Sequence, residues 1–221
     1  MARRIFLGSL WLALTIYAIA SSFTKTQQGD FELIVKMSTG DFAGINPLLI
    51  AIFYIMGIFP VVYGAFILFD SNQKLSPYPF WAVSFGVGAF ALLPYLALRQ
   101  SDTTWNKSKG WLLKILDSRL TAIASSVALI GLMTWGLTQG NWSDFVAQWQ
   151  TSQFVHVMTI DFCFLCLLFP AILGDDIKRR GVEGMLKAIA YIPLFGALIY
   201  WCSRPQLPET ANSLVNQRSA S

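Results

Sequence analysis

Long runs without a charged residue constrain this chain more than any other feature of its sequence. Five such runs are present, Ile5–Thr24, Phe42–Phe69, Leu75–Leu98, Leu120–Ser143 and Ala188–Ser203. A sixth, Phe154–Leu173, is interrupted only by His156 and Asp161. Most exceed the ~18 residues that mark a candidate transmembrane helix, and about 20 residues cross ~30 Å of hydrocarbon. We therefore expect six transmembrane helices.

The composition supports a membrane protein. Hydrophobic residues make up 55% and charged residues 13%, against about 45–50% and about 25% in soluble domains. The fold class expected is an all-α polytopic membrane helix bundle, with one transmembrane domain over residues 1–203 and a flexible polar tail over residues 204–221. The formal charge of +4 comes from basic residues in short loops. It indicates topology and a lipid bilayer as partner, and no nucleic acid is expected.

The first apolar run has two interpretations. "MARR" followed by "IFLGSLWLALTIYAIASS" resembles a signal peptide, with Ala18-Ile19-Ala20 as a cleavage site. The alternative is a retained helix. We favour retention, because the apolar run of about 19 residues is longer than the ~7–15 of a signal-peptide core.

The basic residues predict an orientation. Eleven Lys and Arg fall in the first, third and fifth connections of the six-helix arrangement, and five fall on the other side. This places the third and fifth loops in the cytoplasm and both termini opposite, although Arg3 and Arg4 oppose that placement. In the third loop, "WLLKILDSRL" is either an interfacial helix or an early start of the fourth span. Asp175 and Asp176 are expected to be solvated in a tight cytoplasmic turn.

Two short similar segments suggest an internal repeat. "TQQGDF" follows the first apolar run, and "TQGNW" follows the fourth. Repeat units over residues 5–98 and 119–203 would each contain three crossings, so the halves would be inverted relative to one another, as in many transporters. Chance similarity between two short polar segments is the alternative.

Glycine and proline inside the apolar runs are candidates for helix breaks. Gly57 and Pro60 fall near mid-membrane and Pro170 falls late in its run, where a proline removes a backbone donor. The alternative is that these residues are simply common in transmembrane helices. We interpret Gly86 and Gly88 as helix-packing positions.

Asp161 is the strongest functional candidate. An ionisable side chain inside an apolar span is costly, at least ~2.5 kcal/mol on insertion scales, and is by default a functional-site hypothesis. We expect Asp161 to face the bundle, to meet Tyr54, Ser84 or Ser125, and to be either structural or proton-exchanging.

The only histidine, His156, is a candidate cofactor ligand. One imidazole nitrogen suffices for an axial bond to haem or chlorophyll; the alternative is a histidine hydrogen-bonded near the membrane surface, where water reaches it. Cys163 and Cys166 have the spacing of a redox pair, but we favour a packing role, because burial raises a thiol pKa. The sequence predicts no catalytic residue and no metal site.

The stretches "NPLLIAIFYIMGIFPVVYGAF", "IDFCFLCLLFPAILGDDIKRRG" and "RPQLPE" resemble a family of uncharacterised multi-span membrane proteins of cyanobacteria and plastids. The likeness covers most of the chain from Asn46 onward. It implies a thylakoid membrane, or the plasma membrane of a cyanobacterium, and it implies no particular activity.

Three functions are compatible with these observations. The first is a non-enzymatic accessory or assembly partner of a photosynthetic-membrane complex, which predicts no midplane cavity. The second is a small-solute or proton-coupled transporter, which predicts a polar cavity flanked by Pro60 and Pro170, with Asp161 as the titrating group. The third is a membrane oxidoreductase with a bound redox cofactor. We favour the first.

Overall fold

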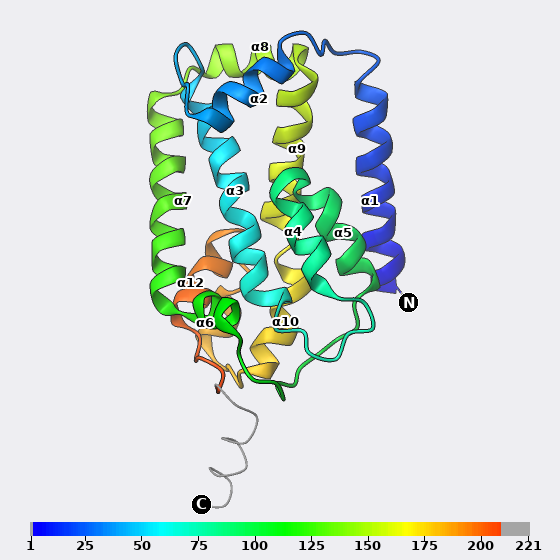
Figure 1. The fold of residues 1–221 in the computed structure, drawn as a ribbon, viewed down its shortest axis with the longest axis vertical. Helices are drawn as coiled ribbons and strands as arrows, with labels where there is room; N and C mark the ends of the chain where they lie inside the picture. Colours follow the sequence, from blue (N-terminus) through cyan, green and yellow to red (C-terminus); the bar gives the residue numbers. More distant parts are fainter. Residues whose placement is uncertain (1, 209–221) are drawn as a thin grey trace, which may run out of the picture.

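The computed structural model describes residues 2–208, in which all regular elements are helices (Figure 1). Four stretches are long and apolar enough to cross a membrane. They are α1 (Ala2–Ser21), α3 (Pro47–Ile67), α7 (Arg119–Gln139) and the stretch Gln153–Arg179, which comprises α9 (Gln153–Leu167) and α10 (Pro170–Arg179). The all-helical, membrane-compatible fold is therefore confirmed, whereas six spans are not.

Two of the six expected spans are pairs of shorter helices. The run Leu75–Leu98 contains α4 (Pro77–Val87) and α5 (Ala89–Leu98). The run Ala188–Ser203 contains the end of α11 (Met185–Ile189) and all of α12 (Phe195–Ser203). The α4–α5 hairpin begins and ends at the same end of the molecule (Figure 1). Gln73, before α4, donates from Nε2 to the carbonyl of Gln100, after α5, at 2.7 Å. The hairpin thus enters the bundle and returns.

Short helices cover both ends of the bundle. At one end, α2 (Asp30–Thr39) and α8 (Trp142–Thr151) lie across the long helices, and we call this the α2/α8 end (Figure 1). At the opposite end, which we call the charged end, lies α6 (Trp111–Asp117). Ser118 ends α6 and caps α7 by accepting a hydrogen bond from Leu120 N. The "WLLKILDSRL" segment is therefore a separate helix followed by the start of a span.

The amino terminus lies at the charged end, where the Arg3 guanidinium donates to the Arg99 carbonyl. The chain also comes back to this end after α12, where the Leu207 N–H donates to Asp117 of α6 at 3.0 Å. The expectation that both termini lie opposite the third loop is therefore wrong for the amino terminus and for the carboxyl end of the described residues. The reason is that α4–α5 returns to the end it came from, so one crossing fewer separates the amino terminus from that loop. In addition, α1 and α7 run in the same direction (Figure 1), so the inverted relation expected between the halves is not found.

The start of the predicted tail is packed against the bundle. Arg204 is buried, and the backbone N–H of Leu207 donates to Asp117 at 3.0 Å. The predicted flexible tail therefore cannot begin at residue 204. Its remaining residues, 209–221, lie outside the described part of the chain.

Helix α3 forms the centre of the bundle. Gly57 and Pro60 were candidates for breaks, but α3 continues through both of them. Pro60 has no N–H and so removes one intrahelical hydrogen bond, but neighbouring helices can satisfy backbone groups that a proline leaves unpaired. Here the carbonyl of Pro60 itself accepts a hydrogen bond from Trp81 Nε1 at 2.8 Å. Pro170 does mark a break, because it is the first residue of α10, after α9 ends at Leu167.

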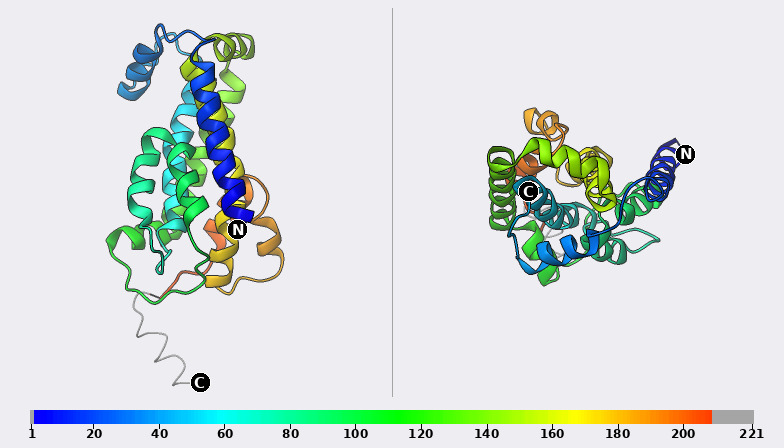
Figure 2. Two further views of the ribbon diagram at one scale, coloured as in Figure 1. Left: turned by 90° about the vertical axis from the view of Figure 1, so that its right-hand side faces the viewer. Right: turned by 90° about the horizontal axis from the view of Figure 1, so that it is seen from above.

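Helix α7 packs closely on α3, whereas α1 lies at the edge of the bundle (Figure 2). Gly136 of α7 lies against Ala51 of α3, where a side chain at Gly136 would collide. Small residues permit such close approach between membrane helices. Helix α1 instead packs on α5, where Trp11 Nε1 donates to the Phe90 carbonyl at 3.0 Å.

Candidate functional site

Asp161 lies inside the bundle, about 12 Å along α9 from its start at 1.5 Å per residue. Its side chain is 3% exposed, and its Oδ1 accepts a hydrogen bond from the backbone N–H of Ala89 at 2.8 Å. Ala89 is the first residue of α5, and the amino end of a helix has unpaired N–H groups and a favourable dipole for a negative charge. Asp161 therefore faces the bundle, and its polar partner is a helix terminus.

The close approach of Asp161 depends on Gly88, at the tip of the α4–α5 hairpin. Gly88 has a φ of 52°, a conformation that side chains disfavour. A Cβ at this position would also overlap the Asp161 carboxylate. The interpretation of Gly88 as a helix-packing residue was therefore incomplete, because it forms the turn that brings the α5 terminus to Asp161.

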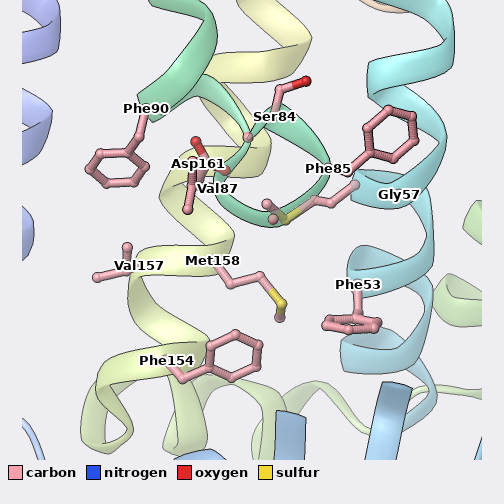
Figure 3. A pocket seen from close by; sticks show the side chains of 13 residues that line it. Phe53, Gly57, Ser84, Phe85, Val87, Phe90, Phe154, Val157, Met158 and Asp161 are labelled. Atoms are coloured by element: carbon pink, nitrogen blue, oxygen red, sulfur yellow. The ribbon is translucent and has the colours of Figure 1, made fainter. Parts of the chain in front are cut away.

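A pocket of about 300 Å³ lies beside Asp161, between α3, α9 and the hairpin tip (Figure 3), and it opens to the surface beside the exposed Phe85 and Val87. We call it the chamber. Its walls are Phe53, Met56, Gly57, Ser84, Phe85, Gly86, Val87, Gly88, Phe90, Phe154, Val157, Met158 and Asp161. Gly57 therefore borders the chamber instead of breaking α3. Pro60 and Pro170 are not among the lining residues, so the expected position of the cavity was wrong.

The side chains proposed as partners of Asp161 bond elsewhere. Ser84 borders the chamber, but its Oγ donates to the Trp81 carbonyl at 2.6 Å. Tyr54 donates to the Met37 carbonyl at 2.8 Å, and Ser125 does not line the chamber. Within residues 2–208, Asp161 Oδ2 receives no hydrogen bond. The chamber therefore contains one carboxylate oxygen that is free to accept.

His156 is enclosed by aromatic side chains at the start of α9. Its Nε2 lies 2.8 Å from the Tyr17 hydroxyl, and its Nδ1 lies 2.9 Å from the Trp149 carbonyl. The Tyr17 and Trp149 rings pack on the imidazole, with centroids at 5.6 and 4.7 Å. The side chain is 2% exposed, so the expectation of a water-accessible histidine was wrong. Haem or chlorophyll ligation would require His156 to give up one of these bonds.

The cysteines lie away from the chamber. Cys163 lines a separate apolar groove between α1 and α9, and Cys163, Cys166 and Cys202 are all free thiols. No cluster of three or more His, Cys, Asp or Glu side chains suited to a metal ion occurs within residues 2–208. The part of the site that can bind a ligand is therefore Asp161 with its apolar surroundings.

Two similar clusters of buried polar side chains occupy the charged end. In one, the hydroxyl of Tyr95 and the Nε of Arg99 donate to Asp70 at 2.7 and 2.8 Å. Arg179 connects the clusters, since it pairs with both Asp70 and Asp176, at 2.9 and 3.3 Å.

In the second cluster, Tyr200 and Arg204 donate to Asp176 at 2.9 and 2.8 Å. Asp176 is 1% exposed. The expectation of a solvated turn at Asp175 and Asp176 was therefore wrong, because both lie on α10 and pair with arginines.

Asp117 joins this network from the end of α6. Its carboxylate lies 2.6 Å from Lys109 and 2.8 Å from Arg180. Burial raises the pKa of Asp117, but the nearby positive charges of Arg180, Arg204 and Lys109 outweigh burial and hold this pKa below its ordinary value. This network could not be predicted from the sequence, because its residues are far apart along the chain.

No protein-family model, curated protein or solved structure matches this chain. The functional argument therefore rests on the residues of the site.

Proposed function

We propose that this chain is a proton-coupled membrane transporter for a small solute, in which Asp161 takes up and releases the proton. The observation that carries the proposal is the position of Asp161, whose Oδ1 is held by the Ala89 N–H while its Oδ2 has no donor in the described chain. A buried carboxylate beside a chamber has a place for a proton and a place for a solute.

The helical hairpin supports this proposal. Irregular backbone at membrane depth is tolerated where it is buried in protein or lines a cavity, and the broken helices of transporters form their binding sites in this way. The hairpin tip, Gly86 to Gly88, lines the chamber. An accessory protein without a transport site predicts no such cavity, which is why we now favour transport.

We further propose that the bundle consists of two parallel repeat units instead of inverted ones. In each half a long helix (α1 or α7) leads to a short helix across the α2/α8 end, then to a returning long helix and a hairpin. The halves also share a pattern of aspartate, tyrosine and arginine, namely Asp70, Tyr95 and Arg99 in one and Asp176, Tyr200 and Arg204 in the other. Parallel repeats occur in several transporter families.

Proton flux into proteoliposomes tests the proposed transport. We expect purified protein to acidify vesicles that hold a pH-sensitive dye together with one of a panel of small cationic, neutral or anionic solutes, because proton uptake by Asp161 is coupled to movement of the solute. Asp161→Asn keeps the side-chain shape and removes the titration, so it should abolish the flux. Asp41→Asn is the matched control, since Asp41 is exposed near the end of α2, and it should leave the flux unchanged. Equal flux with Asp161→Asn, or no flux above protein-free vesicles, would contradict the proposal.

A role as accessory partner is the second candidate, and the groove between α1 and α9 favours it. This groove has a volume of about 640 Å³ and is lined mainly by apolar side chains such as Phe6, Leu10 and Phe164. Such a surface fits lipid or another membrane helix. Location in a photosynthetic membrane, suggested by the family resemblance, belongs to this proposal. Affinity purification from native membranes tests it, and recovery of the chain alone would count against it.

A further inference from the structure

The walls of the chamber favour one class of ligand. Four of the lining side chains are phenyl rings, Phe53, Phe85, Phe90 and Phe154, seen around the chamber in Figure 3. The faces of aromatic rings attract cations, and the rings with Met56 and Met158 also supply apolar contact. Asp161 is the only titratable residue among the lining residues. The chamber thus combines a single negative group with apolar and aromatic walls.

The unpaired carboxylate oxygen of Asp161 decides which charge the ligand of the chamber should have. Oδ1 is taken by the Ala89 N–H, and Oδ2 has no donor among the described residues. A buried carboxylate without a counter-ion is costly, and a bound cation would offset that cost. An anionic ligand would be repelled, and a neutral apolar ligand would leave Oδ2 unpaired. An apolar molecule with one positive charge satisfies both the carboxylate and the walls.

We infer that the chamber binds a lipophilic ammonium ion, with its positive nitrogen against Asp161 Oδ2 and its apolar part among the phenyl rings. This inference rests on the proposed transport function and names the class of its solute. A volume of about 300 Å³ is at the lower end of the range for ligand pockets, ~300–1,000 Å³. It therefore suits an amine that carries a single ring or a short chain.

Proton and solute compete for one carboxylate in this arrangement. Protonation of Asp161 removes the charge that attracts the ammonium ion, so the two ligands exclude each other. Tyr63 of α3 lies close enough to Asp161 to interact with its charge, but it does not line the chamber, and its hydroxyl donates to the Leu165 carbonyl at 2.6 Å. Helices α4 and α5 contribute no titratable side chain to the lining. Asp161 is therefore the group whose titration should govern binding.

Calorimetric titration of the full chain in lipid nanodiscs tests the inference. Benzyltrimethylammonium is a suitable probe, because its charge does not change with pH. We expect it to bind at high pH and to bind more weakly as the pH falls. Its neutral isostere, neopentylbenzene, should bind more weakly at every pH. Asp161→Asn should bind the ammonium probe about tenfold more weakly or worse, because it loses the contact with a charged group.

The control variant Asp41→Asn should bind as the unmodified chain does. Equal affinity for the cation and its neutral isostere, or binding that does not change with pH, would overturn the inference without any variant. Unchanged affinity in a monodisperse Asp161→Asn preparation would overturn it as well. If proton flux depends on Asp161 but the ammonium ion does not bind, only the solute class is wrong. If both experiments fail, the transport proposal fails too.

Discussion

The contact between Gly88 and Asp161 determines the geometry of the candidate site. Asp161 can accept from the start of α5 only because Gly88 has no side chain and a positive φ of 52°. Gly88 also makes room for the second carboxylate oxygen, Oδ2, which lies where a Cβ of Gly88 would be and receives no hydrogen bond from the described residues. One glycine therefore sets both the turn of the hairpin and the availability of the functional group.

Replacement of Gly88 by alanine should destabilise the protein strongly. A non-glycine residue in this conformation costs about 1–3 kcal/mol, and the added Cβ would also collide with Asp161. We expect a clearly lower midpoint of thermal unfolding in detergent. The matched control is Gly86→Ala, because a Cβ at Gly86 meets nothing within 4 Å and alanine favours helix. Equal midpoints for the two variants would show that the Gly88 turn is not constrained.

At the scale of elements, the length of each helix decides whether it can cross a membrane. Helices α4 and α5 contain 11 and 10 residues, which corresponds to about 16 and 15 Å at 1.5 Å per residue. Each is about half of the ~30 Å of a hydrocarbon core. The hairpin therefore returns to the charged end, and the connections before and after it lie on the same side.

Labelling of single cysteines distinguishes the hairpin from a crossing helix. In a background without the three native cysteines, we expect Lys74→Cys and Lys107→Cys to react with a membrane-impermeant maleimide from the same side. Gln28→Cys, in the loop before α2, is the control and should react only from the other side. All three positions are exposed. Reaction of positions 74 and 107 from opposite sides would show that the segment between them crosses the membrane, and it would contradict the α4–α5 hairpin.

At the scale of the whole molecule, charge is distributed unequally between the two ends. Lys25 and Lys36 lie toward the α2/α8 end, in the first connection and in α2. The charged end contains Arg3, Arg4, Lys74, Arg99, Lys107, Lys109, Lys114, Arg119, Lys178, Arg179, Arg180 and Arg204. By the positive-inside rule the charged end should face the cytoplasm, and the labelling experiment also tests this orientation. With the amino terminus at this end, Arg3 and Arg4 no longer conflict with the rule.

The ion-pair network should make stability depend on pH below about 4. The pKa of Asp117 is lowered in the folded chain, so the stability it contributes is fully present above the unfolded pKa of about 3.9. That contribution is lost as the pH falls through the lower, folded pKa. Asp117→Asn leaves Lys109, Arg180 and Arg204 without this partner and should cost about 3–5 kcal/mol at neutral pH.

Thermal unfolding at pH 7 and pH 3 measures both effects for Asp117. The difference between Asp117→Asn and the unmodified chain should shrink at the lower pH. Glu32→Gln is the control, since Glu32 forms only an exposed pair with Lys36. A difference that stays constant with pH would show that the charge of Asp117 does not contribute to stability.

The sequence by itself determined that this chain is all-helical and apolar enough for a membrane, because long apolar runs favour membrane helices whatever the arrangement of those helices. The sequence also singled out Asp161, because a carboxylate in an apolar span has an unfavourable transfer free energy in any fold. It also located Pro170 as a break, since proline cannot continue α9. Only the tertiary structure decided that Leu75–Leu98 is a hairpin, because its turn depends on the contact of Gly88 with α9. The network of Asp70, Asp117 and Asp176 likewise became visible only when distant segments were brought together, since ion pairing depends on proximity in space and not along the chain.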